Sequence, residues 1–181
     1  MKLILFNKPF DVMCQFSPHS SRDTLANYIS IPDIYPAGRL DADSEGLVLL
    51  TDDGKLQHKI SHPNWKENKT YLVQVEGTPS QAQLEQLRQP LDLGDFTTQP
   101  CKAFQIEEPA WLWPRNPPIR QRASIATSWL CITLAEGKNR QVRRMTAAVG
   151  LPTLRLIRSS IGEYSLASHP LLPGESVVIE A

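Results

Sequence analysis

Short apolar runs with the period of β-strands constrain the fold of this chain more than any other feature of its sequence. The runs cover residues 2–6, 47–51, 69–76, 102–106, 124–134, 153–161 and 176–179. Strands in globular proteins have about this length, whereas helices are longer and repeat every 3.6 residues. Because only a few helical patterns separate the runs, the sequence predicts an α+β fold on a mixed, largely antiparallel sheet.

Two of the intervening segments carry helix signals. A capping box that begins at Ser80 predicts a helix with Leu84 and Leu87 on one face. A second helix is predicted from about Arg140 to Val149, because Gly150 then provides a stop signal. Both helices are short enough to pack on a sheet.

The chain of 181 residues is long enough for one ordinary domain or two closely packed halves. Its three cysteines, Cys14, Cys101 and Cys131, show no CxxC spacing, and the apolar run at residues 3–6 is too short for a signal sequence. No apolar stretch approaches the roughly 20 residues of a membrane helix. We therefore expect a cytoplasmic protein with no membrane partner.

Charge is balanced over the whole chain but segregated along it. There are 19 basic and 19 acidic residues, so the total does not indicate a nucleic-acid partner. Between Gly137 and Gly162, however, there is no acid, and the basic residues are Lys138, Arg140, Arg143, Arg144, Arg155 and Arg158. This stretch can form a basic, RNA-facing surface on a neutral protein, or it can be an ordinary solvated helix face.

An acidic turn bounded by glycines is the sharpest local feature. It has the sequence GRLDADSEGLVLLTDDG, residues 38–54, and leads directly into a strand-like segment. A carboxylate in such a turn can attack an anomeric carbon or stabilise an oxocarbenium-like transition state, as in glycoside cleavage. Asp41 is therefore a candidate catalytic residue, although acidic turns between strands are also common surface features.

The same segment allows a second interpretation, a calcium-binding loop at residues 41–52. Its acidic spacing nearly reproduces an EF-hand loop. Three details disagree with that pattern: Glu45 occupies the fifth position, Asp52 replaces the usual bidentate glutamate, and the flanks and interior lack helical character. A calcium module is therefore the weaker alternative.

One segment fits neither helix nor strand. Residues 109–122, PAWLWPRNPPIRQR, combine four prolines with two tryptophans and three arginines. The prolines predict an extended loop. Its aromatic rings can stack on unpaired bases and its arginines can meet phosphates, although large aromatic side chains more often pack into the core.

Four segments in order resemble the RsuA-type ribosomal RNA pseudouridine synthases. Gly38-Arg39-Leu40-Asp41 begins a stretch similar to the family's catalytic signature, and Asp41 falls on its catalytic aspartate. The others are FNKPFDVMCQF (residues 6–16), KTYLVQVEG (residues 69–77) and EGKNRQVRRM (residues 136–145), followed by TLRLIRSSIG (residues 153–162). A set of ordered matches is far less frequent by chance than one short motif. The 109–122 loop resembles a branch that acts on large-subunit RNA.

The resemblance implies an enzyme that isomerises a specific uridine of 23S ribosomal RNA, flipped out of its stack, without cofactor or metal. The implied fold has a sheet in two halves, helices packed on it and an active-site cleft between. We expect residues 1–181 to form the catalytic domain, with no N-terminal S4-type RNA-binding module, and to act as a monomer. A non-catalytic RNA-binding protein remains the alternative.

The predicted second helix places a stripe of Val142, Met145, Thr146 and Val149 on one face, with Arg143 at its edge. From the helix alone, Arg143 reaches inward while its neighbours face solvent or phosphate. The resemblance places on Arg143 the arginine that forms an ion pair with the catalytic aspartate. A neighbouring cation of this kind keeps a carboxylate ionised.

Other roles also follow from the resemblance. Tyr71, which the strand pattern alone makes a core residue, corresponds to an active-site tyrosine that contacts uracil. Arg39 corresponds to an arginine that fills the gap left by the flipped nucleotide. The expected RNA contacts are Arg39, Lys138, Arg140, Arg144, Arg158, Arg115 and Arg120. One departure is Asp11, which stands where the family commonly has glycine, so we expect a different backbone geometry in that turn.

Overall fold

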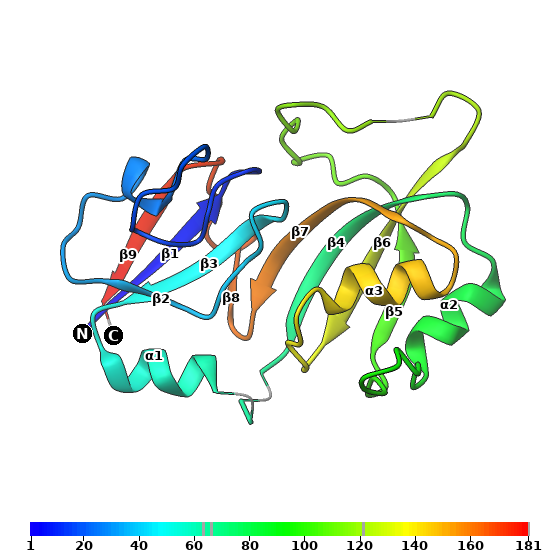
Figure 1. Cartoon of the computed structure of the whole chain (residues 1–181), viewed down its shortest axis with the longest axis horizontal. Coiled ribbons are helices and arrows are strands. Elements are labelled where there is room, and N and C mark those ends of the chain that lie inside the picture. The colour runs from blue at the N-terminus through cyan, green and yellow to red at the C-terminus, as the bar shows by residue number, and fades with distance from the viewer. Residues whose placement is uncertain (63, 66, 121, 181) are drawn as a thin grey trace. The chain divides into compact units, whose positions relative to one another are not determined.

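The chain divides into two compact units in the computed structural model, which describes residues 1–62, 64–65, 67–120 and 122–180 (Figure 1). The first unit comprises Met1–Trp65 and Arg158–Ala181, and the second comprises Lys66–Ile157. Each unit contains strands of a mostly antiparallel sheet, which confirms the predicted α+β class.

The first unit is built on β1 (Lys2–Lys8), whose neighbours are β3 (Glu45–Thr51) and β9 (Ser176–Glu180), both antiparallel to it. The strand order is β7-β3-β1-β9, where β7 (Thr153–Ile161) contributes its C-terminal end. Two short strands complete the unit: β2 (Tyr35–Ala37) pairs with β3, and β8 (Tyr164–Ser165) pairs with β7.

Alternate residues of β1 and β3 form the core of the first unit. Ile4 and Phe6 on β1 share a fully buried cluster with Val48 and Leu50 on β3. Leu25, in the short 3-10 helix Leu25–Asn27, belongs to the same cluster. The side chains on the opposite face of both strands are buried as well, so neither strand shows the polar alternation of a half-exposed sheet.

The second unit contains β4 (Lys69–Glu76), β5 (Lys102–Ile106), β6 (Thr127–Leu134) and the first part of β7, in the order β5-β6-β4-β7. The β4–β6 and β5–β6 pairs are antiparallel. The second unit also contains the helices α2 (Gln81–Arg88) and α3 (Gln141–Ala148) (Figure 1). Side chains of both helices join those of β4 and β6 in one buried cluster.

The two predicted helices are confirmed. Ser80 caps α2 by accepting from the backbone N–H of Gln83, and the Gln83 side chain accepts from the Ser80 N–H in return. Leu84 and Leu87 are both buried, as their spacing indicated. The α3 stripe is buried too, and it includes Gln141, which the apolar pattern could not reveal.

Four elements were not predicted, one of which is the 3-10 helix Leu25–Asn27. Helix α1 (Gly54–Ser61) begins after Asp53, whose carboxylate accepts from the Lys55 N–H, and it packs against β2. None of its residues is fully buried, and its apolar side chains are only Leu56 and Ile60, so the segment shows a weak helical pattern. Strands β2 and β8 contain only three and two residues, too few to show a period. Among the described residues, no helix has both the length and the apolar character needed to cross a bilayer.

The calcium alternative is wrong. Residues 45–51 form β3, which pairs along its length with β1, and the segment before the acidic turn is β2. An EF-hand needs a helix on each side of a coordinating loop, whereas here a strand occupies half of that loop. Within the described ranges, no three His, Cys, Asp or Glu side chains gather as a metal site would require.

Candidate active site

Asp41 lies in the turn that connects β2 to β3 in the first unit. The Ser44 N–H donates to the Asp41 carbonyl oxygen at 3.0 Å and closes the turn. Leu40 and Ser44 are buried on either side, whereas Asp41 is only half-buried. The turn is therefore anchored in the unit by the neighbours of the carboxylate.

A buried lysine holds this turn from β1. The Lys8 side chain is fully buried, and its ammonium donates to the carbonyl oxygens of Pro9 (2.8 Å), Val12 (2.8 Å) and Ala42 (3.2 Å). The Asp11 N–H donates to the same Ala42 oxygen at 2.7 Å. Ala42 follows the candidate catalytic residue directly, so two donors fix the main chain beside that carboxylate.

Burial also changes the acidity of this ammonium. Loss of hydration lowers the pKa of Lys8 from 10.5 to about 8, although the negative groups Cys14, Glu45, Asp43 and Asp11 act in the opposite direction. The charge of Lys8 is therefore sensitive to mildly alkaline pH. In the sequence Lys8 stands between Asn7 and Pro9, and nothing there indicates that the lysine is internal.

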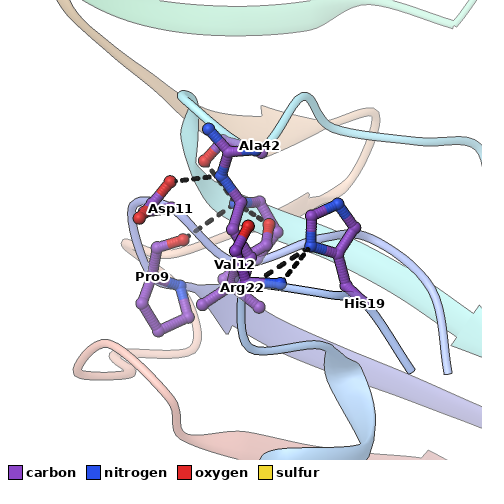
Figure 2. A network of polar contacts seen from close by, with 8 residues as sticks. Pro9, Asp11, Val12, His19, Arg22 and Ala42 are labelled. Carbon is purple, nitrogen blue, oxygen red and sulfur yellow. Dashed lines mark hydrogen bonds and ion pairs between the residues drawn. The ribbon is translucent and has the colours of Figure 1, made fainter. Parts of the chain in front are cut away.

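Asp11 adopts the backbone conformation that glycine favours, with φ at +66°. Asp is among the residues that tolerate the left-handed region, so aspartate can occupy a position that glycine would favour. Its carboxylate forms an ion pair with Arg22 Nε at 2.6 Å. His19 Nδ1 accepts from the N–H groups of Ser21 and Arg22, which holds the loop beside that pair (Figure 2).

Arg158 holds the acidic turn from β7. Its Nε donates to the Leu47 carbonyl at 2.9 Å and its Nη1 to the Arg39 carbonyl at 3.4 Å. The side chain is only 6% exposed, so the expectation of a surface RNA contact at Arg158 is not supported. Gly46 allows this close approach, because a Cβ there would lie 2.3 Å from the Arg158 carbonyl oxygen. Arg39 itself is exposed.

The other two proposed catalytic residues belong to the second unit. Tyr71 lies on β4 opposite Ile132 of β6, and it is 8% exposed within the main buried cluster. Arg143 projects from α3 between the buried Val142 and the partly exposed Arg144. Its Nε atom is buried, as expected for an arginine at the edge of the apolar stripe.

The structure brings three of the expected RNA contacts together. Lys138, Arg140 and Arg144 line a pocket of about 360 Å³ in the second unit. Its other lining residues, which sequence reasoning missed, are Asp95, Phe96 and Asn139. Asn139 lies between Lys138 and Arg140, whereas Asp95 and Phe96 come from a loop some forty positions earlier in the chain, where a single phenylalanine among polar residues gives no periodic signal.

Opposite charges and an aromatic ring meet in this pocket. Arg144 donates to Asp95 at 2.5 Å and to the Leu93 carbonyl at 2.9 Å. The hydrogen bond from Arg144 holds the pKa of Asp95 below its ordinary value. The Lys138 ammonium lies 5.1 Å from the centre of the Phe96 ring and the Arg144 guanidinium carbon 5.3 Å from it, both within cation–π range.

The proline-rich loop is partly fixed by its own residues. Trp113 is buried and Trp111 is exposed, with ring centres 6.1 Å apart. Arg155, buried on β7, donates to the Trp113 carbonyl at 2.9 Å. Arg115 donates to three carbonyls, those of Pro117 (2.8 Å), Pro118 (3.2 Å) and Leu154 (3.4 Å).

The remaining basic residues of this loop differ from Arg115. Arg120 is exposed. Arg122 is also exposed, and it pairs with Glu76 and lowers the pKa of that carboxyl. Gln121 lies outside the described residues. Arg120 is therefore the loop arginine best suited to meet a phosphate, whereas Arg115 supports the loop.

Comparison with known families gives a direct match. Residues 2–148 match the family model described as RNA pseudouridylate synthase. A relative from Vibrio vulnificus, ribosomal large subunit pseudouridine synthase E, is 55% identical over 174 residues, which is 96% of this chain and 73% of the relative. The enzyme of the same name from Xanthomonas campestris pv. campestris is 51% identical over 99% of this chain and 96% of its own length.

More distant relatives share the fold. Ribosomal large subunit pseudouridine synthase B of Bacillus subtilis is 35% identical over 90% of this chain and 62% of its own length. Among solved structures, a crystal structure of pseudouridylate synthase matches with a TM-score of 0.80 and 28% identity, over 99% of this chain and 70% of that one. Human RNA pseudouridylate synthase domain containing 1 is 12% identical with a TM-score of 0.59, covering 98% of this chain and 78% of that one.

Proposed function

The chain belongs to the RNA pseudouridylate synthase family, and on this premise we propose that it converts one uridine of large-subunit ribosomal RNA into pseudouridine. Relatives that share about half of its residues over nearly its whole length are named as large-subunit enzymes. Their named substrate supports the choice of ribosomal RNA over other RNAs. The reaction is an isomerisation within one nucleotide.

The chemistry requires a group that acts at the ribose. The N1–C1′ bond breaks, the uracil turns, and C5 bonds to C1′; C5 then loses its proton and N1 gains one. Asp41 is the proposed catalytic residue, because an ionised carboxylate can either add to C1′ or remove a ribose proton. The other proposed groups hold the nucleotide, assist this carboxylate or accept the proton from C5.

The observation that carries this assignment is the way in which the Asp41 turn is fixed. Lys8 and the Asp11 N–H fix Ala42 on one side, and Arg158 fixes Arg39 on the other. The turn is thus held through main-chain carbonyl groups on both sides of the half-buried Asp41. A preorganised nucleophile or base needs no reorganisation during reaction.

Tyr71 and Arg143 are proposed to complete the catalytic set. Burial of the Tyr71 ring supports a rigid contact with uracil, and its oxygen could take the C5 proton. The partly buried Arg143 suits an ion pair with the catalytic carboxylate. The target uridine must leave its stack to reach these groups, and the exposed Arg39 is proposed to occupy the gap.

RNA contacts outside the catalytic set are proposed for Lys138, Arg140, Arg144 and Arg120, which are exposed or line the second-unit pocket. We extend the proposal to a monomer that works in the cytoplasm, where ribosomal subunits assemble. Residues 1–181 would then supply the whole catalytic function from two compact units.

Pseudouridine mapping tests the proposal. Ribosomal RNA from a strain that lacks this protein should miss one pseudouridine in the large subunit, and the strain should regain it when the protein is restored. The purified protein should also release tritium from RNA labelled at C5 of uridine. An unchanged map together with no tritium release would overturn the proposal, and RNA binding by that inactive protein would favour the alternative of a non-catalytic RNA-binding protein.

A further inference from the structure

We propose that the pocket around Phe96 in the second unit binds one unpaired nucleotide of the substrate RNA, other than the uridine that reacts. The identity of the ligand as RNA rests on the proposed function. The pocket contains none of the proposed catalytic residues Asp41, Tyr71 and Arg143. It is therefore a second place at which the enzyme can grip a single nucleotide.

The lining matches the parts of a nucleotide. A volume of about 360 Å³ is at the small end of ligand pockets and suits one nucleotide rather than a duplex. Lys138 and Arg140 supply positive charge for a phosphate, and the half-buried Phe96 ring supplies an apolar surface for a base. Asn139 adds an amide with both a donor and an acceptor for a base edge.

The loop that carries the cations is held in advance. The Gln141 side chain is buried, and its Nε2 donates to Glu136 at 3.0 Å. Its Oε1 accepts from the Lys138 N–H at 3.3 Å, and Glu136 also accepts from the Gln99 N–H at 2.8 Å. These bonds tie the start of α3 to the segment that follows Phe96.

Arg140 provides a second sign of preorganisation. It adopts the left-handed conformation, with φ at 53° and ψ at 30°, directly before α3. This conformation is uncommon for a residue other than Gly, Asn or Asp, and such outliers concentrate at ligand sites. The strain turns the chain sharply between Asn139 and Gln141, so that three successive residues, 138–140, line one pocket.

In the protein without RNA, the Asp95 carboxylate occupies the place beside Arg144 that a phosphate could take. Its carboxylate accepts two hydrogen bonds from Arg144, yet its side chain is 67% exposed and can move away. An RNA phosphodiester offers the same bidentate geometry with the same single negative charge, and it can also meet Lys138 and Arg140, which line the pocket. We therefore expect RNA to replace Asp95 on Arg144, which makes the carboxylate a competitor of the ligand.

Matched substitutions at the ring and at the carboxylate test this assignment by RNA affinity. Phe96→Leu should weaken binding of the ribosomal fragment roughly ten-fold, because a leucine packs but does not stack, whereas Phe96→Trp should keep the affinity. Asp95→Asn should strengthen binding about three-fold at low salt. The control is Glu85→Gln, which breaks an exposed Glu85–Arg88 pair on α2 and should have a smaller effect. Thermal midpoints show whether each variant folds.

A coupling experiment identifies the nucleotide. Fragments with a single abasic position, moved along the unpaired residues, are titrated with the wild type and with Phe96→Leu. One position should weaken binding to the wild type and have little effect on the variant, because the variant has already lost that stack. Equal penalties at every position, or wild-type affinity for Phe96→Leu, would overturn the proposal.

Tritium release by the wild type keeps this result separate from the proposed function. A protein that binds RNA through Phe96 but releases no tritium would overturn the function and leave the pocket assignment intact. A protein that releases tritium normally and shows no coupling at Phe96 would overturn the pocket assignment and leave the proposed function intact.

Discussion

The ammonium of Lys8 donates a hydrogen bond to the carbonyl oxygen of Ala42 at 3.2 Å, across 34 positions of the chain. Ala42 is the residue after the proposed catalytic Asp41. A buried cation on β1 therefore sets the position of the main chain at the catalytic turn without being a candidate for direct contact with substrate. This relationship leads to the first two predictions.

Lys8→Met should lower both stability and turnover. Methionine fills a similar volume but leaves the carbonyls of Pro9, Val12 and Ala42 without this donor, and each unsatisfied buried acceptor costs about 1 to 3 kcal/mol. The substitution also removes the cost of burying the ammonium charge, which offsets part of this loss. We therefore expect the free energy of unfolding to fall by about 2 kcal/mol. Urea unfolding and kcat measure the two effects. Lys59→Met, exposed on α1, is the control, and a normal kcat in a folded Lys8→Met protein would contradict a positioning role.

The acidity of Lys8 predicts two pH effects. Because its pKa is about 8 when folded and 10.5 when unfolded, the unfolded chain binds more protons between these values. This group therefore disfavours the folded state by about 3 kcal/mol below pH 8, and the penalty disappears as the pH rises towards 10.5. Deprotonation also leaves two N–H donors for three carbonyls, so kcat should fall above about pH 8.

A pH profile of Lys8→Met separates this group from others that titrate in the same range. The variant should lack the decline near pH 8 while keeping any decline that arises from the RNA. An identical profile in the wild type and the variant would assign the decline to another group.

Asp41→Asn should fold normally and bind RNA but lose at least about 1,000-fold in the rate of pseudouridine formation, because the reaction depends on the charge of the carboxylate. Its turn is held by main-chain bonds, which the substitution does not remove. Tritium release under single-turnover conditions gives the rate. Asp43→Asn, in the same turn, is the matched control and should remain active. Release at the wild-type rate would refute the role of Asp41.

Arg143→Ala should reduce the single-turnover rate more than Arg140→Asn. Arg143 has its Nε buried at the edge of the α3 stripe, whereas Arg140 is exposed at the pocket. Asparagine at position 140 tolerates the left-handed conformation, so the second variant removes charge with little strain. It should mainly weaken RNA binding and reduce the logarithmic salt slope by roughly 0.7 to 0.9. Equal losses of rate in both variants would contradict this division.

Arg120→Ser should weaken RNA binding without changing the thermal midpoint, since Arg120 is exposed. Arg115→Ser should instead lower the midpoint, because its guanidinium holds the carbonyls of Pro117, Pro118 and Leu154. Affinity across a salt series and thermal unfolding distinguish the two. If Arg120→Ser binds as the wild type does at every salt concentration, the loop has only a structural role.

Local signals in the sequence predicted those parts of the fold that depend on neighbours in the chain. The capping box at Ser80 and the stop at Gly150 belong to α2 and α3, and period-two runs gave the long strands. Helix α1 was missed because only Leu56 and Ile60 give it an apolar period, which is a weak signal even beside the Asp53 cap. The acidic turn made Asp41 a candidate, and the order of the family motifs then favoured the proposed catalytic role over a surface turn.

The roles of the basic residues were decided by tertiary structure. The stretch between Gly137 and Gly162 reads as one basic segment, yet Arg155 and Arg158 are buried on β7 while Lys138 and Arg140 are exposed before α3. Arg158 is enclosed because β3 lies alongside it at Gly46, and Arg144 meets a carboxylate 49 positions earlier. The sequence alone determines which residues are charged. Their exposure and their partners depend on distant segments that folding brings beside them, and a local sequence pattern does not contain that information.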